Sequence, residues 1–363
     1  MTRSALTSHQ RGMSLLELLV GIVISMLTVL VITQLFLDSE RQRRVPSSGA
    51  HAQINGILAL DAVQRDVRQA GYGLGGGPWL GTCTTGDLAE AKAAGLSNLL
   101  LQPVVITAGS GTAPSDSIAV LSSGKIDAAT QIKLAEEHAN GNGKFVVPST
   151  MGVEVGDWLI VATKSGAACS AFQAQSLTAV APWGITPSGS VPQYAEGSML
   201  SNMGAAPVRR SWSVVGSGTN AFRLQVSNLA IAATPTASDA YPDVVLLRAL
   251  YAKDTNADGA IDTYDATAPA TRADWNQVIG VRLALVVRST HWSKDEVTAD
   301  GMEWSFGTAS VAGGSACTAN ASHSCLKLGL THTAASGSTE WKHYRYRMYE
   351  SMIPLRNLLW NVG

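Results

Sequence analysis

Charge is scarce in this chain of 363 residues. Asp, Glu, Lys and Arg together make up 15% of it, and the formal net charge is -1. Proteins that attract nucleic acid over long range carry a clear excess of Lys and Arg. The composition therefore gives no support to a protein that binds nucleic acid through its overall charge.

The sequence motifs of common enzymes are also absent. The chain has no G-x-S-x-G, no H-E-x-x-H and no Walker loop, because Lys125 and Lys144 lack the upstream glycine at the required spacing. His138 follows Glu136 and Glu137, but nothing in the sequence places a second metal ligand nearby, and a surface turn is the better interpretation. We therefore predict that the protein is not an enzyme.

Repeats of fixed period and long low-complexity tracts are missing too, whereas glycine is plentiful, with 35 residues. Beyond Pro78, short alternating segments between turn residues indicate half-buried strands. The candidate strands are residues 117–121, 157–163, 212–215, 222–226, 244–250, 281–288 and 343–349. A short helix is expected at residues 271–278, around Trp275. The sequence thus predicts a β-rich globular domain over residues 78–363.

One long apolar run lies near the N-terminus. Residues 18–37, LLVGIVISMLTVLVITQLFL, contain no charge, and as a helix they would span about 30 Å, the thickness of the hydrocarbon layer of a bilayer. A secretory signal peptide has a shorter apolar region that ends in a small-residue cleavage site. This run is instead followed by Asp38, Glu40 and three arginines. We therefore predict a transmembrane helix, whose orientation the flanking charges leave open.

Arg11 and Gly12 precede this run, and Glu17 is the fifth residue after Gly12. This arrangement resembles the class III leader of type IV prepilins, in which a dedicated peptidase cuts after the glycine and methylates the new N-terminus. The resemblance implies a leader peptide at residues 1–12 and an N-methylated Met13, where the family usually has Phe. It also implies that residues 13–37 form the transmembrane part of the N-terminal helix.

Glu17 needs an explanation, because an ionised carboxylate is costly in hydrocarbon. It could reach the lipid headgroups, since it lies close to the end of the helix. The resemblance implies another role. In pilins this glutamate is thought to pair with the N-terminal amine of a neighbouring subunit as the helix moves from the lipid into the filament. We predict this assembly role for Glu17.

Residues 38–77 are expected to form an amphipathic continuation of the helix and a glycine-rich linker. A kink or break is predicted at residues 45–49, VPSSG. The apolar face of the helix is expected to consist of Ile57, Leu60, Val63, Val67 and Ala70. The glycines of residues 71–77, GYGLGGG, match G-x-G-x-x-G, but they follow a helix, whereas a dinucleotide site needs a preceding strand. They are expected to end the helix.

Three segments resemble the PilW branch of minor pilins. They are RDVRQAGYG at residues 65–73, WNQVIGVRLALVVRS at residues 275–289, and PLRNLLW at residues 354–360 after a strand. The family implies an α+β, type IV pilin-like fold, in which a long N-terminal helix packs on a β-rich domain with an antiparallel sheet. It also implies an inner-membrane precursor with a periplasmic domain, which later joins the pilus.

The resemblance implies a structural role in priming pilus assembly, in or near a tip complex. The implied partners are other minor and major pilins, the prepilin peptidase, the inner-membrane assembly platform and a tip adhesin. Two alternatives are a minor pseudopilin of a type II secretion system and a membrane-tethered protein that binds DNA or a surface directly.

The C-terminal strand bears on the last alternative. Arg345, Arg347, Tyr344 and Tyr346 could form a stacking platform for single-stranded DNA. A strand with its tyrosines inward and its arginines outward is the preferred interpretation, because one strand makes only a small basic patch. Direct binding of nucleic acid is therefore not expected.

Four cysteines in a domain expected in the oxidising periplasm suggest two disulfides, for which three pairings are possible. Cys317 and Cys325 are close in sequence and could close a small loop. Cys83 and Cys169 then remain. We predict these two pairs.

Residues 254–265, DTNADGAIDTYD, match the D-x-[DN]-x-[DN]-G pattern of calcium loops. Gly259 would make the turn. The expected ligands are Asp254, Asn256, Asp258, the carbonyl of Ala260, Asp262 and Asp265. Asp265 stands where such loops usually have Glu, and the flanks depart from a full EF-hand. An ordinary turn rich in Asp and Asn is the alternative. We predict a weak Ca²⁺ site.

Overall fold

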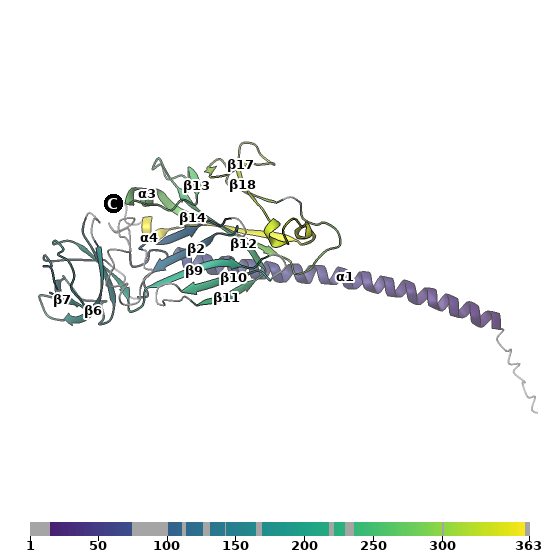
Figure 1. The fold of residues 1–363 in the computed structure, drawn as a ribbon, viewed down its shortest axis with the longest axis horizontal. Coiled ribbons are helices and arrows are strands. Elements are labelled where there is room, and N and C mark those ends of the chain that lie inside the picture. The colour runs from purple at the N-terminus through teal and green to yellow at the C-terminus, as the bar shows by residue number, and fades with distance from the viewer. Residues whose placement is uncertain are drawn as a thin grey trace, which may run out of the picture. The chain divides into compact units, whose positions relative to one another are not determined.

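The computed structural model describes residues 15–74, 101–110, 114–125, 131–141, 143–164, 169–217, 221–228, 236–299 and 301–359. The chain divides into two compact units, Met1–Ala50 and His51–Gly363. Helix α1 (Leu15–Arg68) belongs to both of them. Every strand that the structure describes belongs to the second unit (Figure 1). The architecture is α+β, as predicted.

Helix α1 is assigned as one helix of 54 residues, so the break expected at residues 45–49 is wrong. Pro46 removes one backbone hydrogen bond. Helix formation is cooperative, however, and extending an existing helix through a few poor residues costs less than nucleating a second one. The helix ends at Arg68, and the chain then turns through Gly71 and Gly73, whose φ angles are 74° and 84°. This end confirms the predicted helix stop.

The last turns of α1, which lie in the second unit, bury a stripe of small residues. The buried positions recur at helical spacing and are Ala52, Gly56, Ala59, Val63 and Val67, followed by Ala70 just beyond the end of the helix. The predicted face is confirmed for its last three members, but Ile57 is 56% exposed and Leu60 is only half-buried. Small side chains occupy the packed face because the helix lies very close to the sheet beneath it.

Gly56 is the position where this close approach is most evident. A Cβ atom built on Gly56 would lie 2.3 Å from Cε2 of Tyr349, on β19 (Tyr346–Pro354). Any side chain at residue 56 would therefore push the helix or the tyrosine ring aside. This contact explains why glycine, a poor helix former, stands inside the helix.

Two five-stranded sheets share one hydrophobic core with the end of α1. The first has the order β1 (Val104–Thr107), β2 (Ser117–Ser122), β9 (Val208–Val215), β10 (Arg223–Asn228), β11 (Ala237–Pro242). The second has the order β16 (Ser310–Val311), β13 (Thr263–Asp265), β12 (Val244–Lys253), β14 (Val278–Arg288), β19. Their pairs are antiparallel except for β13 with β16.

The buried carboxylate of Asp116 joins these two sheets. It accepts hydrogen bonds from the N–H of Ala249, at 2.9 Å, and from the N–H of Gly109, also at 2.9 Å. Arg248 adds an ion pair at 2.7 Å. Asp116 directly precedes β2, whereas Ala249 lies in β12. This charge is paired and hydrogen-bonded, as a buried carboxylate must be to remain stable.

The remaining strands form two further sheets. One has the order β15 (Met302–Ser305), β18 (Ser324–Leu328), β17 (Ser315–Ala316). The other has the order β3 (Ile132–Lys133), β8 (Met199–Gly204), β5 (Trp158–Ala162), β6 (Cys169–Thr178), β7 (Gly184–Pro187), β4 (Phe145–Val146). The short helices are α3 (Arg272–Gln277), α4 (Arg356–Leu359), η1 (Thr331–Thr333) and η2 (Glu340–His343).

The six-stranded sheet belongs to an inserted β module, which we define as the described residues between 131 and 204. Strands β2 and β9 pair directly with each other, and the chain leaves the first sheet after one and returns with the other. The module has its own apolar core, which includes Phe145, Phe172 and Tyr194. Other buried residues of the module, among them Trp158, Ile160 and Met203, belong to the core that includes the end of α1. The module therefore packs partly on its own core and partly on the core around α1.

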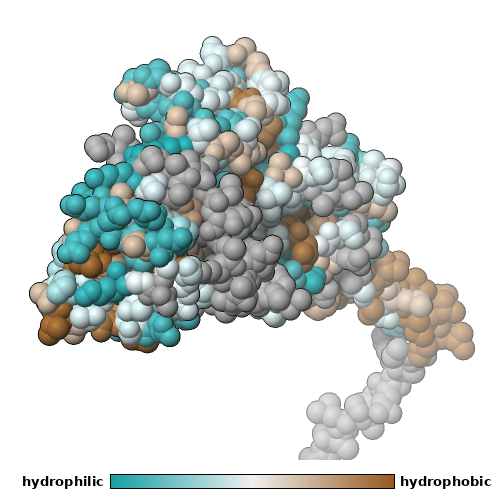
Figure 2. All heavy atoms as spheres, turned by 60° about the vertical axis from the view of Figure 1, so that its left-hand side comes forward, coloured by the Kyte–Doolittle hydropathy of each residue, from teal (hydrophilic) through white to brown (hydrophobic). Residues whose placement is uncertain are grey.

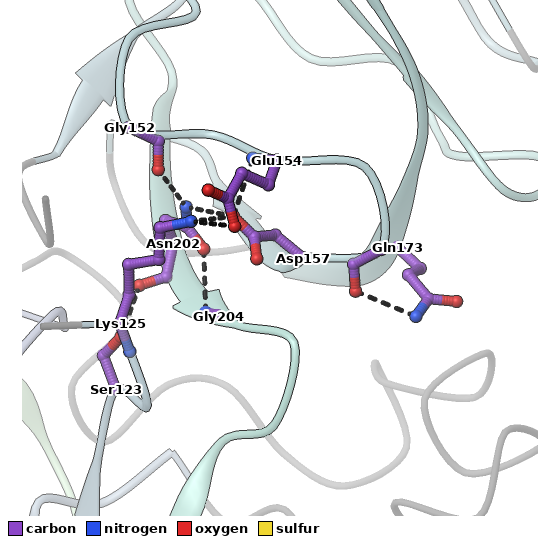
Figure 3. Close-up of polar contacts among 9 residues, drawn as sticks. Ser123, Lys125, Gly152, Glu154, Asp157, Gln173, Asn202 and Gly204 are labelled. Atoms are coloured by element: carbon purple, nitrogen blue, oxygen red, sulfur yellow. Dashed lines mark hydrogen bonds and ion pairs between the residues drawn. The ribbon is translucent and has the colours of Figure 1, made fainter. Parts of the chain in front are cut away.

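A polar cluster fastens this module to the end of β2 (Figure 3). The buried Asp157 accepts hydrogen bonds from Asn202, at 2.8 Å, and from the N–H of Glu154, at 2.9 Å. Lys125, beyond β2, forms ion pairs with Glu154 at 2.8 Å and with Asp157 at 3.3 Å. Lys125 donates hydrogen bonds to Glu154 and Asp157, and these raise its pKa above the ordinary value, although burial opposes them. The cluster is internally satisfied, so we interpret it as a structural junction.

Each predicted strand overlaps an observed one, although the last begins at Tyr346 instead of residue 343. The predicted helix around Trp275 is α3. Thr271 accepts a hydrogen bond from the N–H of Asp274, and the Asp274 side chain accepts one from the N–H of Thr271. This reciprocal capping box explains why so short a helix starts there.

Asp66 holds α1 on the first sheet. Its carboxylate accepts hydrogen bonds from Nε1 of Trp212, at 2.8 Å, and from a guanidinium nitrogen of Arg210, at 2.9 Å. Beyond the helix, Asn357 donates to the carbonyl of Ala70 at 3.0 Å. Residues from β9 and α4 thus fix the C-terminal end of α1.

Replacing Gly56 by Val should destabilise the second unit by about 2 kcal/mol, because the side chain would overlap Tyr349. Denaturant unfolding of the full chain in detergent would measure this. Gly329→Ala is the control: a Cβ at Gly329 meets no atom within 4 Å, and we expect a change below about 0.5 kcal/mol. Equal stability of Gly56→Val and wild type would contradict the close packing of the helix.

Asp66→Ala should cost about 3 kcal/mol, because Trp212 would lose its buried hydrogen-bond acceptor and Arg210 its partner. The matched control is Asp61→Ala on the same helix. Asp61 pairs with Arg65 at 2.6 Å, but both side chains are more than half exposed, so its loss should change stability by at most about 0.5 kcal/mol. Similar losses for the two variants would show that Asp66 does not hold the helix.

Candidate functional site

The first part of α1 can cross a membrane by its length and composition. Leu15–Phe36 is a 22-residue apolar stretch, and none of it is buried within the structure. Figure 2 shows this part of the chain as an apolar surface, whereas most of the remaining face is polar or mixed. An exposed apolar helix is unfavourable in water, and hydrocarbon is the solvent that suits it. This segment anchors the chain in a membrane.

The polar side chains inside this stretch bond to the helix itself. The hydroxyl groups of Ser25, Thr28 and Thr33 donate to the carbonyls of Ile22, Ile24 and Val29 at 2.7–2.8 Å. Polar groups have no water to bond within a bilayer and must be satisfied internally. These three residues therefore do not interrupt the predicted span.

Glu17 lies in the first turn of α1 and is exposed. A carboxylate is favoured there by the partial positive charge of the helix N-terminus. Gly12 and Met13, the two predicted processing residues, lie outside the described residues. The structure therefore places Glu17 at the start of the apolar helix, while its pairing with a neighbouring subunit stays a prediction.

The loop at residues 254–265 folds back on its own side chains. The carboxylate of Asp254 accepts from the N–H groups of Ala257, at 2.7 Å, and Gly259, at 2.8 Å. Asp258 accepts from the N–H of Ala260 at 2.7 Å. Ala257 and Gly259 have φ angles of 61° and 86°, so the backbone turns sharply at both positions.

The other acidic residues of this loop have separate partners. Thr255 donates to Asp262 from its hydroxyl and its N–H, and these bonds lower the pKa of Asp262. Asp265, the expected last ligand, pairs with Lys253 at 2.8 Å. In the described part of the chain, no group of three or more His, Cys, Asp or Glu side chains is close enough to hold a metal ion. The calcium site, with Asn256 as a further expected ligand, stays a prediction.

Two further sequence predictions concern the disulfides. Cys317 and Cys325 form a disulfide with a Cα–Cα distance of 4.9 Å, which confirms the first predicted pair. Cys169 is also in a disulfide. Its predicted partner, Cys83, lies outside the described residues.

The tyrosines of the C-terminal strand face inward. The hydroxyl of Tyr346 lies 2.7 Å from that of Thr333, and the guanidinium of Arg288 stacks 4.6 Å above the ring of Tyr344. Arg345 and Arg347 are exposed. The preferred interpretation of this segment, with tyrosines inward and arginines outward, agrees with the structure, and the two tyrosine rings do not form an exposed platform.

Sequence reasoning missed the residues that attach the helix. In the sequence, Asp66 is one of several charges on an amphipathic helix. Its partner Trp212 lies 146 positions away, so no local pattern connects the two. Gly56 has no signal beyond being an isolated glycine in a helical pattern, which can indicate a close packing contact. Both roles depend on contacts between segments distant in the chain.

Comparison with known families gives two matches. Residues 7–33 match the prokaryotic N-terminal methylation motif, which covers the predicted cleavage position and most of the apolar span. Residues 214–357 match the type IV pilus-assembly protein W family, PilW. The second match runs from the end of β9 into α4, and it includes β12, β14 and β19 but neither α1 nor the inserted β module. No curated protein and no solved structure matches the chain.

These matches agree with the geometry. The motif falls on the helix that anchors the chain in a membrane, and the family match falls on the sheet that holds Gly56 and the end of α1. Membership of this group implies association with other pilins and with the pilus machinery. The N-terminal motif and the C-terminal match together support a PilW-type minor pilin of the type IV pilus.

Proposed function

We propose that the protein is a structural minor pilin that helps to prime assembly of the type IV pilus, and that it sits in or near the tip complex. The observation that carries the proposal is the continuity of α1. One helix has an apolar, unburied first part with Glu17 in its first turn, and a last part locked onto a β-rich unit. Such a helix can be drawn from lipid into a filament without unfolding the unit attached to it.

The prepilin peptidase would first cut between Gly12 and Met13. The new N-terminus would then be an amine in an apolar environment, where an isolated charge is costly. Glu17 would compensate the amine of a neighbouring pilin as the helix enters the filament. The first turn of the helix would place the Glu17 carboxylate at about the same depth in the membrane as that amine.

The outer side of the last part of α1 supports association with other pilins. Ile54, Ile57 and Leu58 are each at least half exposed, although the helix buries smaller residues on its opposite side. Large apolar side chains on the surface of a monomer commonly indicate an interface. We propose that the helices of neighbouring pilins cover these three residues in the filament.

We propose that the β-rich unit is periplasmic in the precursor and becomes extracellular in the pilus. The disulfide Cys317–Cys325 supports this location, because disulfides form and persist in oxidising compartments. The inner-membrane assembly platform and a tip adhesin are the further partners of this proposal. Binding and positioning are sufficient for this role, and no catalytic step is assigned to the chain.

We further propose that Ca²⁺ binds to the loop at residues 254–265. The sharp turns at Ala257 and Gly259 and the N–H groups bonded to Asp254 support a backbone that is already folded around the first ligand position. Binding would require Asp262 and Asp258 to turn toward Asp254. Asp265 would have to exchange Lys253 for the ion, so a weak site is expected, with a Kd of roughly 10⁻⁴ to 10⁻³ M.

The processing step can be tested with Gly12→Val. This substitution should block cleavage, so that the chain isolated from membranes still begins at Met1, whereas the wild-type chain begins at Met13. Mass spectrometry of the N-terminal peptide identifies the first residue of the variant and of the wild-type chain. A wild-type chain that retains Met1, or that begins after Leu37, would contradict the processing scheme.

Glu17→Ala should leave membrane insertion intact, because alanine suits hydrocarbon better than a carboxylate does. Its amount in sheared pili should fall at least about tenfold, which corresponds to the loss of about 1.4 kcal/mol of pairing energy. Immunoblots of membranes and of sheared pili give the two readings. Wild-type levels of the variant in pili would refute the pairing role of Glu17.

Calcium binding can be measured by calorimetry on the full chain in detergent. One Ca²⁺ should bind at millimolar concentration, and Asp254→Ala combined with Asp258→Ala should abolish the signal. Asp295→Ala, at an exposed acidic residue elsewhere in the unit, should leave it unchanged. No heat and no rise in Tm at millimolar Ca²⁺ would reduce this loop to an ordinary turn.

A further inference from the structure

An exposed aromatic ring lies in the segment that follows β14. Trp292 is 47% exposed, and its ring stacks on that of His343 with centroids 5.1 Å apart and planes inclined by 24°. Nδ1 of His343 lies 2.9 Å from the carbonyl oxygen of Ser293, and the N–H of Ser293 donates to the carbonyl of His343 at 2.8 Å. The indole is therefore held in place while much of its surface meets solvent.

Two arginines continue the side of the chain on which this ring rests. Tyr344 has an extended backbone, with φ −109° and ψ 150°, and β19 begins at Tyr346. In an extended chain alternate side chains point the same way, so those of His343, Arg345 and Arg347 share one side. Both arginines are exposed. We call Trp292, His343, Arg345 and Arg347 the Trp292 patch.

The backbone beneath the Trp292 patch is fixed. The N–H of Ser289 donates to the carbonyl of Arg345 at 2.8 Å, and the N–H of Arg345 donates to the hydroxyl of Ser289 at 3.2 Å. Arg347 lies in β19 and pairs with Val287 of β14. A partner that binds here meets a surface whose backbone is already ordered, so binding loses little conformational entropy.

Within the described ranges, the two guanidinium groups have no carboxylate partner. Among the residues that the structure describes, neither Arg345 nor Arg347 takes part in an ion pair. Arg210, Arg248 and Arg282, by contrast, pair with carboxylates at 2.7–2.9 Å. The side chain of Arg347 also interacts with the hydroxyl of Tyr349. The other donors of the two arginines are available to an external acceptor.

We propose that the Trp292 patch docks an acidic protein surface presented by another subunit of the pilus. This inference rests on the proposed function and adds the surface and the chemistry of its partner. Trp and Arg are the residue types that most often dominate the energy of protein interfaces. Guanidinium groups bind carboxylates through two parallel hydrogen bonds. The partner places carboxylates opposite Arg345 and Arg347, and an apolar side chain on Trp292.

The surroundings of Trp292 favour a protein over a nucleic acid. Asp295 and Glu296 are exposed within four residues of it, and Glu296 lies 3.9 Å from Lys342. A phosphate backbone that crossed the indole would meet these carboxylates and be repelled. A protein surface can place an uncharged or basic group opposite them. An aromatic centre with charges of both signs around it is typical of a protein interface.

Photocrosslinking in cells that assemble pili tests this proposal. The full chain would carry p-benzoylphenylalanine in place of Trp292. The expected product is a crosslink to one pilin subunit, within a peptide that contains Asp or Glu. The same photoreactive residue in place of Met151, which is 85% exposed in the inserted β module, should not give that product.

Charge reversal identifies the contribution of the arginines. Arg345→Glu combined with Arg347→Glu should reduce the crosslink at residue 292 by roughly tenfold, or more. Replacing the partner's carboxylates by lysine should restore it. Arg272→Glu, at an exposed arginine in α3, is the matched control and should change nothing. Arg345→Gln with Arg347→Gln removes the charge without reversing it, and it should lower the crosslink less than the reversal does. An unchanged Tm of the full chain in detergent shows that each variant is folded.

The outcomes separate this inference from the proposed function. An unchanged crosslink in a folded double variant overturns the inference, as does a crosslink from residue 292 only to nucleic acid, or to many proteins with equal yield. Absence of the wild-type chain from both sheared pili and pilin complexes overturns the proposed function. A wild-type chain present in pili, with the double variant incorporated and crosslinked equally well, overturns the inference alone.

Discussion

The packing of the last turns of α1 against the sheet is the constraint on which the rest of the structure depends. The first part of this helix exposes mostly apolar side chains, as a lipid environment requires, and its last part packs on protein. Gly56 brings the helix within contact of Tyr349, while Asp66 fixes it through Trp212.

The same constraint explains the distribution of buried charge. Asp66 and Asp116 are both buried carboxylates, and each joins elements that are distant in the sequence. Burying them would be costly if they lacked partners, and each has an arginine as well as N–H donors. Such groups specify one arrangement of the helix and the two sheets, because any other arrangement would leave a charge unpaired.

The inserted β module is attached to the first sheet through its two connections and a polar junction. It leaves and re-enters the first sheet between two paired strands, and it has an apolar cluster of its own besides the residues that it adds to the core around α1. Its junction with β2 is a satisfied polar cluster around Asp157 (Figure 3). The family match covers the second five-stranded sheet and not this module. The family match thus covers the sheet that contacts Gly56, whereas Trp212 and Arg210, which bind Asp66, lie just outside it.

Much of the fold could be predicted from contiguous residues. The apolar run specified the span, the alternating segments specified the strands, and the residues from Thr271 to Asp274 specified the start of α3. The short spacing of Cys317 and Cys325 indicated their disulfide. These predictions succeeded because hydrophobic periodicity, helix capping and short loop closure act over a few neighbouring residues.

Tertiary structure alone decided which side of α1 is buried and which polar residues anchor it. Periodicity placed Ile57 on the packed face, but the sheet approaches so closely that Gly56 and Ala59 occupy it, and Ile57 is exposed. The stacking of Trp292 on His343 likewise joins residues 51 positions apart. The amino-acid sequence by itself determined the local elements and the leader motif. Their mutual contacts depend on the shape of the assembled surfaces, which no single stretch of the chain contains.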